Sequence, residues 1–379
     1  MVGAMRTPYG RRGGALCAWH PVDLAAYLLR ELVARDDLDP ATIDDVVFGC
    51  VSQVGAQACN VARHAALAAG WPEEVPGVTV DRQSASSAQA VHWAAQAVMS
   101  GAQEMVVAGG VEVMSTVPMG ANLAVASVGK PYGQRLRHRY QDSGGLVPPA
   151  LAADKVATLC ALSRAQLDEW VLTSHERAQR AQQTERHHVL AVPAGRELLA
   201  RDEAVVPSLS VDDVGSFTAL FAEGGTATAA NLAGEGDGAA GLLIASTRRA
   251  EALGLVPKAR LVSFATAGSA PALWPLATIE ASRRALHRCA LSVSDIDHFE
   301  IHESSAAAVL AWLLALGAVP ERVNPVGGSL ARTAPQGAVG AGLFVEAVAG
   351  IAERGAGRAL VSVAGEGGVA TACVMESPT

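Results

Sequence analysis

Ser84 is the residue whose type and position best suit covalent chemistry. It lies in a turn between an expected buried strand at residues 78–80 and an expected alanine-rich helix at residues 88–99. Backbone N–H groups at the start of a helix point outward and stabilise negative charge. A nucleophile there could form an acyl intermediate whose oxyanion these N–H groups bind. The alternative is that Ser84, Ser86 and Ser87 only cap the helix.

His302 is the candidate base for this nucleophile. It follows an expected buried strand at residues 296–301. An imidazole near Ser84 could remove the proton of the hydroxyl group. The alternative is a packed histidine with a purely structural hydrogen bond, which is also what we expect of Glu303. The turn at residues 364–368 offers further backbone N–H groups to an oxyanion.

Strands and helices that could position these residues alternate along the chain. We expect strands at residues 43–49, 104–110, 241–245, 261–267 and 360–365, and helices at 21–34, 60–70, 88–99 and 278–290. Such alternation predicts an α/β fold with a mainly parallel sheet.

The end of the chain repeats the order of its beginning. Residues 43–49 resemble residues 296–302, and helices and a further strand follow both in the same order. A period this long indicates duplicated halves rather than a solenoid. Ligands of parallel sheets bind beyond the carboxyl ends of the strands, so Ser84 and His302 are expected to meet at the seam between the halves. A glycine-rich loop at 327–342 would allow a substrate to approach there, although it lacks the spacing of a dinucleotide-binding loop.

These patterns predict three structural parts. We assign residues 1–114 and 226–250 to an N-terminal half, residues 115–225 to an inserted loop domain, and residues 251–379 to a C-terminal half. The insertion is more polar than its surroundings, and it contains an expected helix within residues 162–183. Long insertions of this kind commonly carry substrate contacts.

Composition narrows the class of protein. Half of the 379 residues are hydrophobic, 17% are charged, and the net charge is −8. We therefore expect a globular protein with no nucleic-acid partner, and we find no apolar run that predicts a membrane span. The six cysteines have neither metal-site spacing nor the density of a disulfide framework. We expect no metal, and reduced thiols in the cytoplasm.

Ordered motifs over nearly the whole length resemble the thiolase superfamily. They are Arg6-Thr7-Pro8, Asp45-Val46-Val47-Phe48-Gly49-Cys50-Val51, Asp81-Arg82-Gln83, Ala108-Gly109-Gly110-Val111-Glu112-Val113-Met114-Ser115 with Pro118, Gly225-Thr226-Ala227-Thr228-Ala229-Ala230-Asn231, Asp237-Gly238-Ala239-Ala240, His302-Glu303, Val323-Asn324 with Gly327-Gly328, and Gly367-Gly368. The resemblance implies a duplicated thiolase-type fold with a layered αβαβα core and an inserted loop domain. It also implies acyl-thioester chemistry and a homodimer.

Three reactive positions depart from the family pattern. Ser84 stands where the family has a cysteine nucleophile, Ala334 where it has a histidine, and Ser362 where it has a second cysteine. The resemblance leaves His302 as the base, places the backbone of Ser84 and Ala364 at the oxyanion, and puts Glu303 and Thr333 beside the site as supporting residues.

These departures change the expected reaction. A hydroxyl group has a far higher pKa than a thiol and needs a base. An oxyester is also less reactive toward a carbanion than a thioester. We therefore expect transfer of an acyl group through Ser84 to an alcohol, an amine or water, rather than Claisen condensation. We expect no bound cofactor. The acyl donor is a thioester of coenzyme A or of carrier-protein pantetheine, because residues 204–210 lack an arginine that the family carries there.

Two alternatives remain open at the level of sequence. One is a catalytically inactive thiolase-like scaffold that forms a hetero-oligomer with an active partner. The other is an ordinary thiolase with an engineered Cys-to-Ser change at position 84, although this alternative does not account for Ala334 and Ser362.

Overall fold

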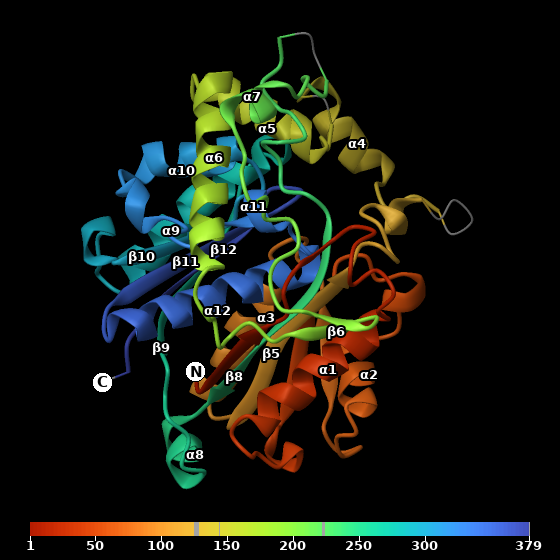
Figure 1. Cartoon of the computed structure of the whole chain (residues 1–379), viewed down its shortest axis with the longest axis vertical. Helices are drawn as coiled ribbons and strands as arrows, with labels where there is room; N and C mark the ends of the chain where they lie inside the picture. The colour runs from red at the N-terminus through yellow and green to blue at the C-terminus, as the bar shows by residue number, and fades with distance from the viewer. Residues whose placement is uncertain (125–128, 144, 222–223, 379) are drawn as a thin grey trace.

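Two open sheets form the core of the computed structural model, which describes residues 1–124, 129–143, 145–221 and 224–378 (Figure 1). The first sheet has the order β1-β8-β5-β3-β4, with β2 beside β8, and the second has the order β10-β11-β12-β9. The strands of the first sheet are β1 (Gly3–Arg6), β2 (Gly10–Arg11), β3 (Asp45–Gly49), β4 (Gly77–Val80), β5 (Met105–Val113) and β8 (Gly236–Ala245). Those of the second are β9 (Arg260–Gly268), β10 (His298–Ile301), β11 (Arg358–Gly365) and β12 (Val369–Glu376).

The two sheets share one topology, which confirms the predicted duplication. β3 and β5 are parallel, whereas β8 runs antiparallel to both β5 and β1. In the same way β10 and β11 are parallel, whereas β12 runs antiparallel to both β11 and β9. The expectation of mainly parallel sheets is therefore wrong. Hydrophobic runs reveal buried strands but not their directions, and the short connection between β11 and β12 permits only an antiparallel pair.

The helices complete five layers, as predicted. Helices α3 (Ser86–Met99) and α12 (Gln336–Arg354) lie together between the sheets and share one buried cluster with both of them (Figure 1). The outer face of the first sheet is covered by α1 (Pro21–Ala34) and α2 (Val61–Ala68). That of the second is covered by α9 (Ala277–Arg288) and α10 (Ala306–Leu316). The α1 bounds agree with the predicted helix residue for residue.

The expected glycine-rich loop at 327–342 is mostly helical. It contains the short helix α11 (Ser329–Arg332) and the first two turns of α12. Gly340 acts there as a close-packing residue, because its Cβ would lie 2.7 Å from the Ala88 nitrogen of α3, whereas Gly327, with φ of 78°, forms a turn before α11. The beginning of α12 is a helix that is buried on all sides, and a run of small residues does not by itself predict such a helix.

The expectation of a buried strand before Ser84 is wrong in part for β4. This strand lies at the edge of its sheet, and 42% of the Val78 surface is exposed. Apolar residues in a short run look alike whether the strand is central or at an edge, because the difference lies in which strands pair with it.

Residues 115–225 pack mainly against the C-terminal half. Their helices are α4 (Gln134–Tyr140), α5 (Pro149–Leu159), α6 (Arg164–Ala181) and α7 (Val211–Gly215), and their strands are β6 (Val192–Ala194) and β7 (Glu197–Leu199). Helix α6 confirms the helix predicted within 162–183. Its apolar face, with Leu167 and Trp170, joins the cluster that contains α9 and α10. The division into two halves and an insertion at the stated boundaries stays a prediction.

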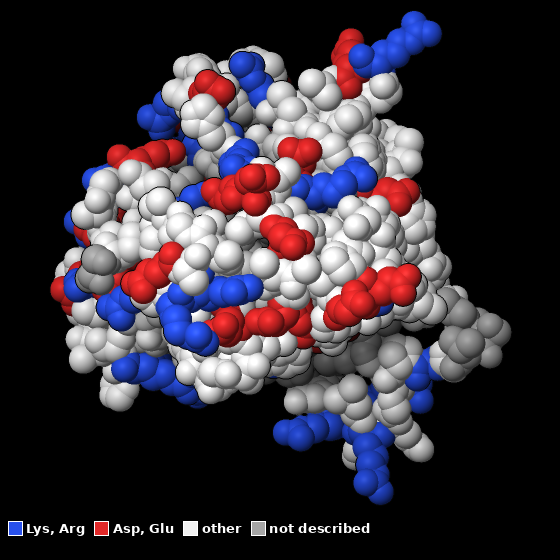
Figure 2. Space-filling model, turned by 90° about the horizontal axis from the view of Figure 1, so that it is seen from below, with Lys and Arg blue, Asp and Glu red and all other residues white. Residues whose placement is uncertain are grey.

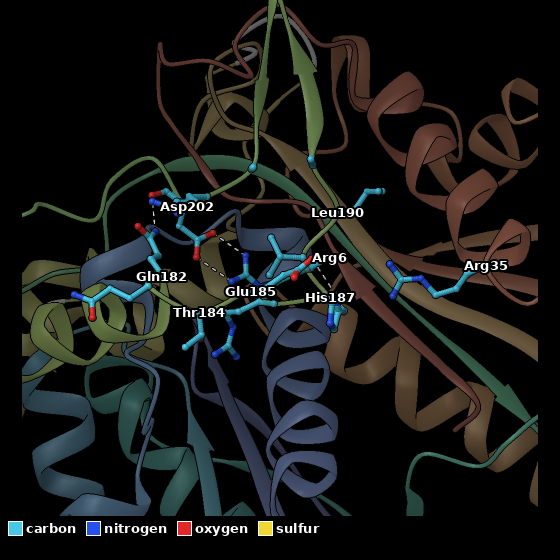
Figure 3. A pocket seen from close by; sticks show the side chains of 14 residues that line it. Arg6, Arg35, Gln182, Thr184, Glu185, His187, Leu190 and Asp202 are labelled. Atoms are coloured by element: carbon cyan, nitrogen blue, oxygen red, sulfur yellow. Dashed lines mark hydrogen bonds and ion pairs between the residues drawn. The ribbon is translucent and has the colours of Figure 1, made fainter.

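A buried ionic cluster ties this segment to the core. Both guanidinium Nη atoms of Arg6 donate to the Asp202 carboxylate, at 2.7 and 2.9 Å, and Arg6 Nε donates to Glu346 on α12. The Gln182 side chain donates to the Asp202 carbonyl (Figure 3). Burial alone would raise the pKa of Asp202, but the charges of Arg6 and Arg332 hold it below its usual value. The adjacent cavity, of about 530 Å³, contains none of the predicted site residues.

Two general features of the molecule are the hydropathy of its helices and the distribution of its surface charges. Among the described helices, none is long and apolar enough to cross a bilayer. On the face drawn in Figure 2, acidic and basic side chains are interspersed over the main body of the molecule.

Candidate active site

The turn that carries Ser84 is held by its own hydrogen bonds. Gln83 adopts a left-handed backbone with φ of 52°, which turns the chain sharply between β4 and α3. The Ser86 hydroxyl accepts the Arg82 N–H at 2.8 Å and closes the turn. Helix α3 has Ala85 as its N-cap, without a side-chain cap. The capping alternative for Ser84 is therefore wrong.

The neighbouring serines do not cap the helix either. Ser87 Oγ accepts the N–H of Ala341 at 2.9 Å and so joins α3 to α12, while Ser86 serves the turn. Both hydroxyl groups therefore bond to groups outside the first turn of α3.

Ser84 and His302 line one cavity of about 340 Å³, together with Ala334. Its other lining residues are largely apolar: Met114, Met119, Pro148, Pro149, Ala150, Leu220, Phe221, Leu232, Ala233, Gly234 and Trp274, with Glu235, Ser304, Gln336 and Glu366 as polar members. The cavity combines an apolar wall with a few converging polar groups, which is typical of a small-molecule site.

The hydroxyl of Ser84 bonds to Glu366. Its Oγ lies 3.4 Å from Oε1 and 3.3 Å from Oε2 of that carboxylate, and the backbone N–H of Ser84 lies 3.5 Å from Oε2. The side chain of Gln336, the first residue of α12, donates to Oε1 at 3.0 Å. Burial raises the pKa of the Glu366 carboxyl, and the hydrogen bonds offset part of that rise.

His302 is buried and neutral at pH 7. Burial lowers its pKa to about 4. Its Nδ1 lies 3.2 Å from the carbonyl oxygen of Ala364. A carbonyl oxygen only accepts, so Nδ1 carries the proton and Nε2 keeps a free lone pair. In the part of the chain that the structure describes, no hydrogen bond joins His302 to Ser84.

The predicted oxyanion donors are partly engaged. The Ser84 N–H faces the Glu366 carboxylate, at 3.5 Å from Oε2, which occupies the side from which a substrate oxygen would approach. Ala364 belongs to β11, where it pairs with Ala370 of β12. The oxyanion role of these two backbones stays a prediction.

The remaining predicted residues lie around the cavity rather than in it. Ser362, with 1% of its surface exposed, is not among the lining residues, and its hydroxyl donates to the Thr371 carbonyl at 3.1 Å. Thr333 has a left-handed backbone, with φ of 76°, and its hydroxyl donates to the Gly10 carbonyl.

Glu303 forms structural hydrogen bonds, as expected. Its carboxylate accepts hydrogen bonds from Trp170 and Ser174 of α6, from the Asn324 amide and from the Leu330 N–H. This network fixes the inserted segment against the loop that leads to α11. The role of Glu303 as a supporting residue of the site stays a prediction.

Sequence reasoning missed Glu366 and Gln336 as site residues. In the sequence, residues 364–368 indicate only a source of backbone N–H groups. The available signal was a single acidic residue within an otherwise alanine and glycine turn after a buried strand. Both side chains also line a second cavity, of about 450 Å³, whose wall includes Val51 and Tyr132. They therefore stand where the two cavities adjoin.

Comparisons with known proteins agree along the whole chain. Residues 1–248 match the family model "Thiolase, N-terminal domain" and residues 255–377 match "Thiolase, C-terminal domain". The chain is 39% identical to a steroid 3-ketoacyl-CoA thiolase of Mycobacterium tuberculosis, over 99% of this chain and 93% of the relative. It is 37% identical to the 3-oxoadipyl-CoA/3-oxo-5,6-dehydrosuberyl-CoA thiolase of Escherichia coli, over 90% of each. A beta-ketoadipyl-CoA thiolase of Pseudomonas aeruginosa is 36% identical, over 98% of this chain and 94% of the relative.

Proposed function

The chain belongs to the thiolase family, and from this premise we propose that it transfers an acyl group from a coenzyme A thioester to an alcohol, an amine or water. Ser84 carries the acyl group. His302, which the sequence suggests as the base of Ser84, is proposed here as the base that removes the proton of the acceptor, because no hydrogen bond joins it to Ser84 in the described structure. The donor is chosen because the relatives are named as thiolases of CoA thioesters. A thioester on a carrier protein is the alternative donor.

The observation that supports this proposal is the shared cavity of Ser84 and His302. Ser84 stands at the beginning of α3, where the helix favours a developing negative charge. The neutral imidazole of His302 opens on the same apolar cavity and is available as a base. The largely apolar wall of the cavity lowers the local dielectric, which strengthens the interactions of charged groups there.

The replaced positions argue against carbon–carbon bond formation. Ala334 lines the cavity with a methyl group where the family has a histidine. Ser362 is bonded to backbone carbonyls and is a weak base. Neither residue can remove a proton from an acetyl methyl group. An engineered change at position 84 alone would leave both of these differences unexplained.

The proposed reaction has two balanced halves. Ser84 Oγ attacks the thioester carbonyl, its C–O bond forms as the C–S bond breaks, and the thiol leaves with one proton. The acceptor then attacks the acyl-serine, His302 takes the acceptor's proton, and that proton returns to Ser84 as the ester bond breaks. Backbone N–H groups of Ser84 and Ala364 bind the oxyanion in both halves.

Intact-protein mass spectrometry after incubation with acyl-CoA thioesters tests the proposal. We expect one acyl adduct per chain, mapped to Ser84 and absent in Ser84→Ala. In His302→Ala the adduct should still form but should persist, with transfer slowed about 10²–10⁴-fold. An adduct that survives in Ser84→Ala, or transfer at full rate in His302→Ala, would contradict these roles.

A second candidate is a non-catalytic subunit of a hetero-oligomer. The specific observation in its favour is the Glu366 carboxylate beside the Ser84 N–H, because a fixed negative charge there opposes an oxyanion. Co-purification with an active thiolase and the absence of any adduct on Ser84 would support this alternative. Turnover by the purified chain alone would exclude it.

A further inference from the structure

We infer that Glu366 removes the proton of the Ser84 hydroxyl, so that these two residues form a serine–glutamate pair which activates the nucleophile. This inference rests on the proposed function and adds to it the group that starts the first half of the reaction. Glu366 is then a catalytic residue, because it touches the reacting oxygen atom.

The contacts of Ser84 carry this inference. Both carboxylate oxygens of Glu366 lie 3.3–3.4 Å from Ser84 Oγ, and no other side chain in the described structure bonds to that hydroxyl. Distances of this kind are long for a hydroxyl–carboxylate bond. Catalytic hydrogen bonds are often long before a substrate binds, and they shorten in the reacting complex.

Gln336 fixes the carboxylate from the opposite side. Its amide donates to Oε1 at 3.0 Å, and it is itself held at the start of the buried helix α12. The Glu366 carboxylate is thus oriented by a neutral amide. None of the ion pairs found in the described chain involves Glu366, and the interactions that lower its pKa are hydrogen bonds, among them those from Ser84 and Gln336. Burial raises the pKa of this carboxyl, which makes it a stronger base than an exposed glutamate.

His302 is less well placed for this step. Its Nδ1 proton is committed to the Ala364 carbonyl, and within the described residues it makes no bond to Ser84. The two residues therefore act at different places. Glu366 contacts the Ser84 hydroxyl, and His302 lines another part of the cavity, where we expect the acceptor to bind.

Proton transfer to Glu366 also neutralises the carboxylate, which would otherwise repel an oxyanion at the Ser84 N–H. As Oγ forms its bond to the thioester carbon, its proton moves to Glu366 and the carboxylate becomes neutral. The negative charge moves to the carbonyl oxygen, which the N–H then binds. When the C–S bond breaks, the protonated Glu366 gives its proton to the thiolate sulfur. Atoms and charge balance, and no further reactant is needed.

A serine-directed fluorophosphonate probe tests the pair independently of acyl transfer. The probe is added to the full chain, and labelling of Ser84 is followed by mass spectrometry. We expect labelling in the natural protein, none in Ser84→Ala, and a rate about 10²–10⁴-fold lower in Glu366→Gln. Glu366→Asp, which keeps the carboxylate on a shorter side chain, should give an intermediate rate. Glu321→Gln, on the exposed surface, is the matched control and should label like the natural protein.

The outcomes separate the two proposals. No labelling of the natural protein, an unchanged rate in Glu366→Gln, or a loss in His302→Gln in place of Glu366→Gln would each overturn the role of Glu366. If Ser84 is labelled through Glu366 but no acyl-CoA gives an adduct, the pair stands and the proposed function fails. If acyl-CoA gives the same adduct rate with and without Glu366, the function stands and the pair fails. Glu366→Asp keeps the test decisive if the glutamine variant does not fold.

Discussion

A hydroxyl at position 84 and a carboxylate at position 366 suit each other chemically. A serine nucleophile needs a base, and Glu366 is the acidic residue that its hydroxyl contacts. A thiol at position 84 would be hindered by the same carboxylate, because a nearby negative charge disfavours the thiolate. The two positions are thus expected to depend on one another.

The first prediction at the residue scale concerns this dependence. Ser84→Cys should carry a thiol with a raised pKa, and the double variant Ser84→Cys/Glu366→Gln should alkylate with iodoacetamide about tenfold faster at pH 7, which corresponds to about one pKa unit. Peptide mapping distinguishes the introduced thiol from the exposed natural thiols, such as that of Cys17. Equal or faster alkylation in the single variant would show that the carboxylate does not act on position 84.

The second residue-scale prediction follows from the lowered pKa of His302. Its value of about 4 lies below the ordinary 6.5, so between pH 6.5 and 4 the unfolded chain binds a proton that the folded chain does not. The free energy of unfolding therefore decreases as pH falls through this window, and His302 contributes about 3 kcal/mol to the decrease.

Urea unfolding at pH 7 and pH 4.5 checks the sign. The loss between the two pH values should be smaller in His302→Gln than in the natural protein. His92, whose pKa burial lowers to about 3, contributes equally to both proteins. His187→Gln is the matched control, because 81% of that side chain is exposed. An identical pH dependence in His302→Gln would show that the imidazole titrates normally.

At the scale of elements, the central helix pair decides where the site residues lie. Helix α12 brings Gln336 to Glu366 and packs against α3, which begins just after Ser84. Their close approach depends on small residues, since a Cβ on Gly340 would lie 2.7 Å from a backbone nitrogen of α3. Packing of this pair therefore links fold stability to site geometry.

We predict that Gly340→Ala destabilises the fold by about 1–3 kcal/mol through overpacking, in spite of the better helix propensity of alanine. Thermal unfolding measures the change. Gly215→Ala is the control, because that glycine ends α7 with open space around its Cβ position, and it should be neutral or slightly stabilising. If Gly340→Ala leaves the melting temperature unchanged, α3 and α12 can move apart without a loss of stability.

At the scale of the whole molecule, the edge of the first sheet is the surface on which we expect a second copy. Strand β4 is an edge strand with an exposed Val78, and 46% of Trp93 on the following helix α3 is exposed. An edge strand with apolar neighbours is a ready template for pairing. We therefore predict that a homodimer forms through this edge.

Light scattering coupled to size-exclusion chromatography tests the assignment. The natural protein should have the mass of a dimer, and Trp93→Arg should shift it to the monomer. Leu314→Arg, at an exposed apolar residue of α10, should leave the dimer intact. A dimer that survives Trp93→Arg would place the interface elsewhere.

The layered fold was predictable because its signals are local or repeated. Helix α1 follows from its apolar spacing, and the duplication follows from two similar runs, at 43–49 and 296–302. Strand direction, the edge position of β4 and the helical form of residues 336–342 were not predictable, because pairing partners and complete burial decide them. The comparisons confirm the family that the ordered motifs indicated.

Residue types and local order are enough to show that Ser84 follows a strand and precedes a helix, and that alanine and serine stand at positions 334 and 362. Which group contacts the Ser84 hydroxyl depends instead on tertiary packing. Glu366 lies 282 residues away along the chain, and it reaches Ser84 because the two duplicated sheets enclose α3 and α12 and bring the turn after β11 against the turn after β4. Contacts across that seam depend on how both sheets pack against the helix layer between them, which no local pattern of residues encodes.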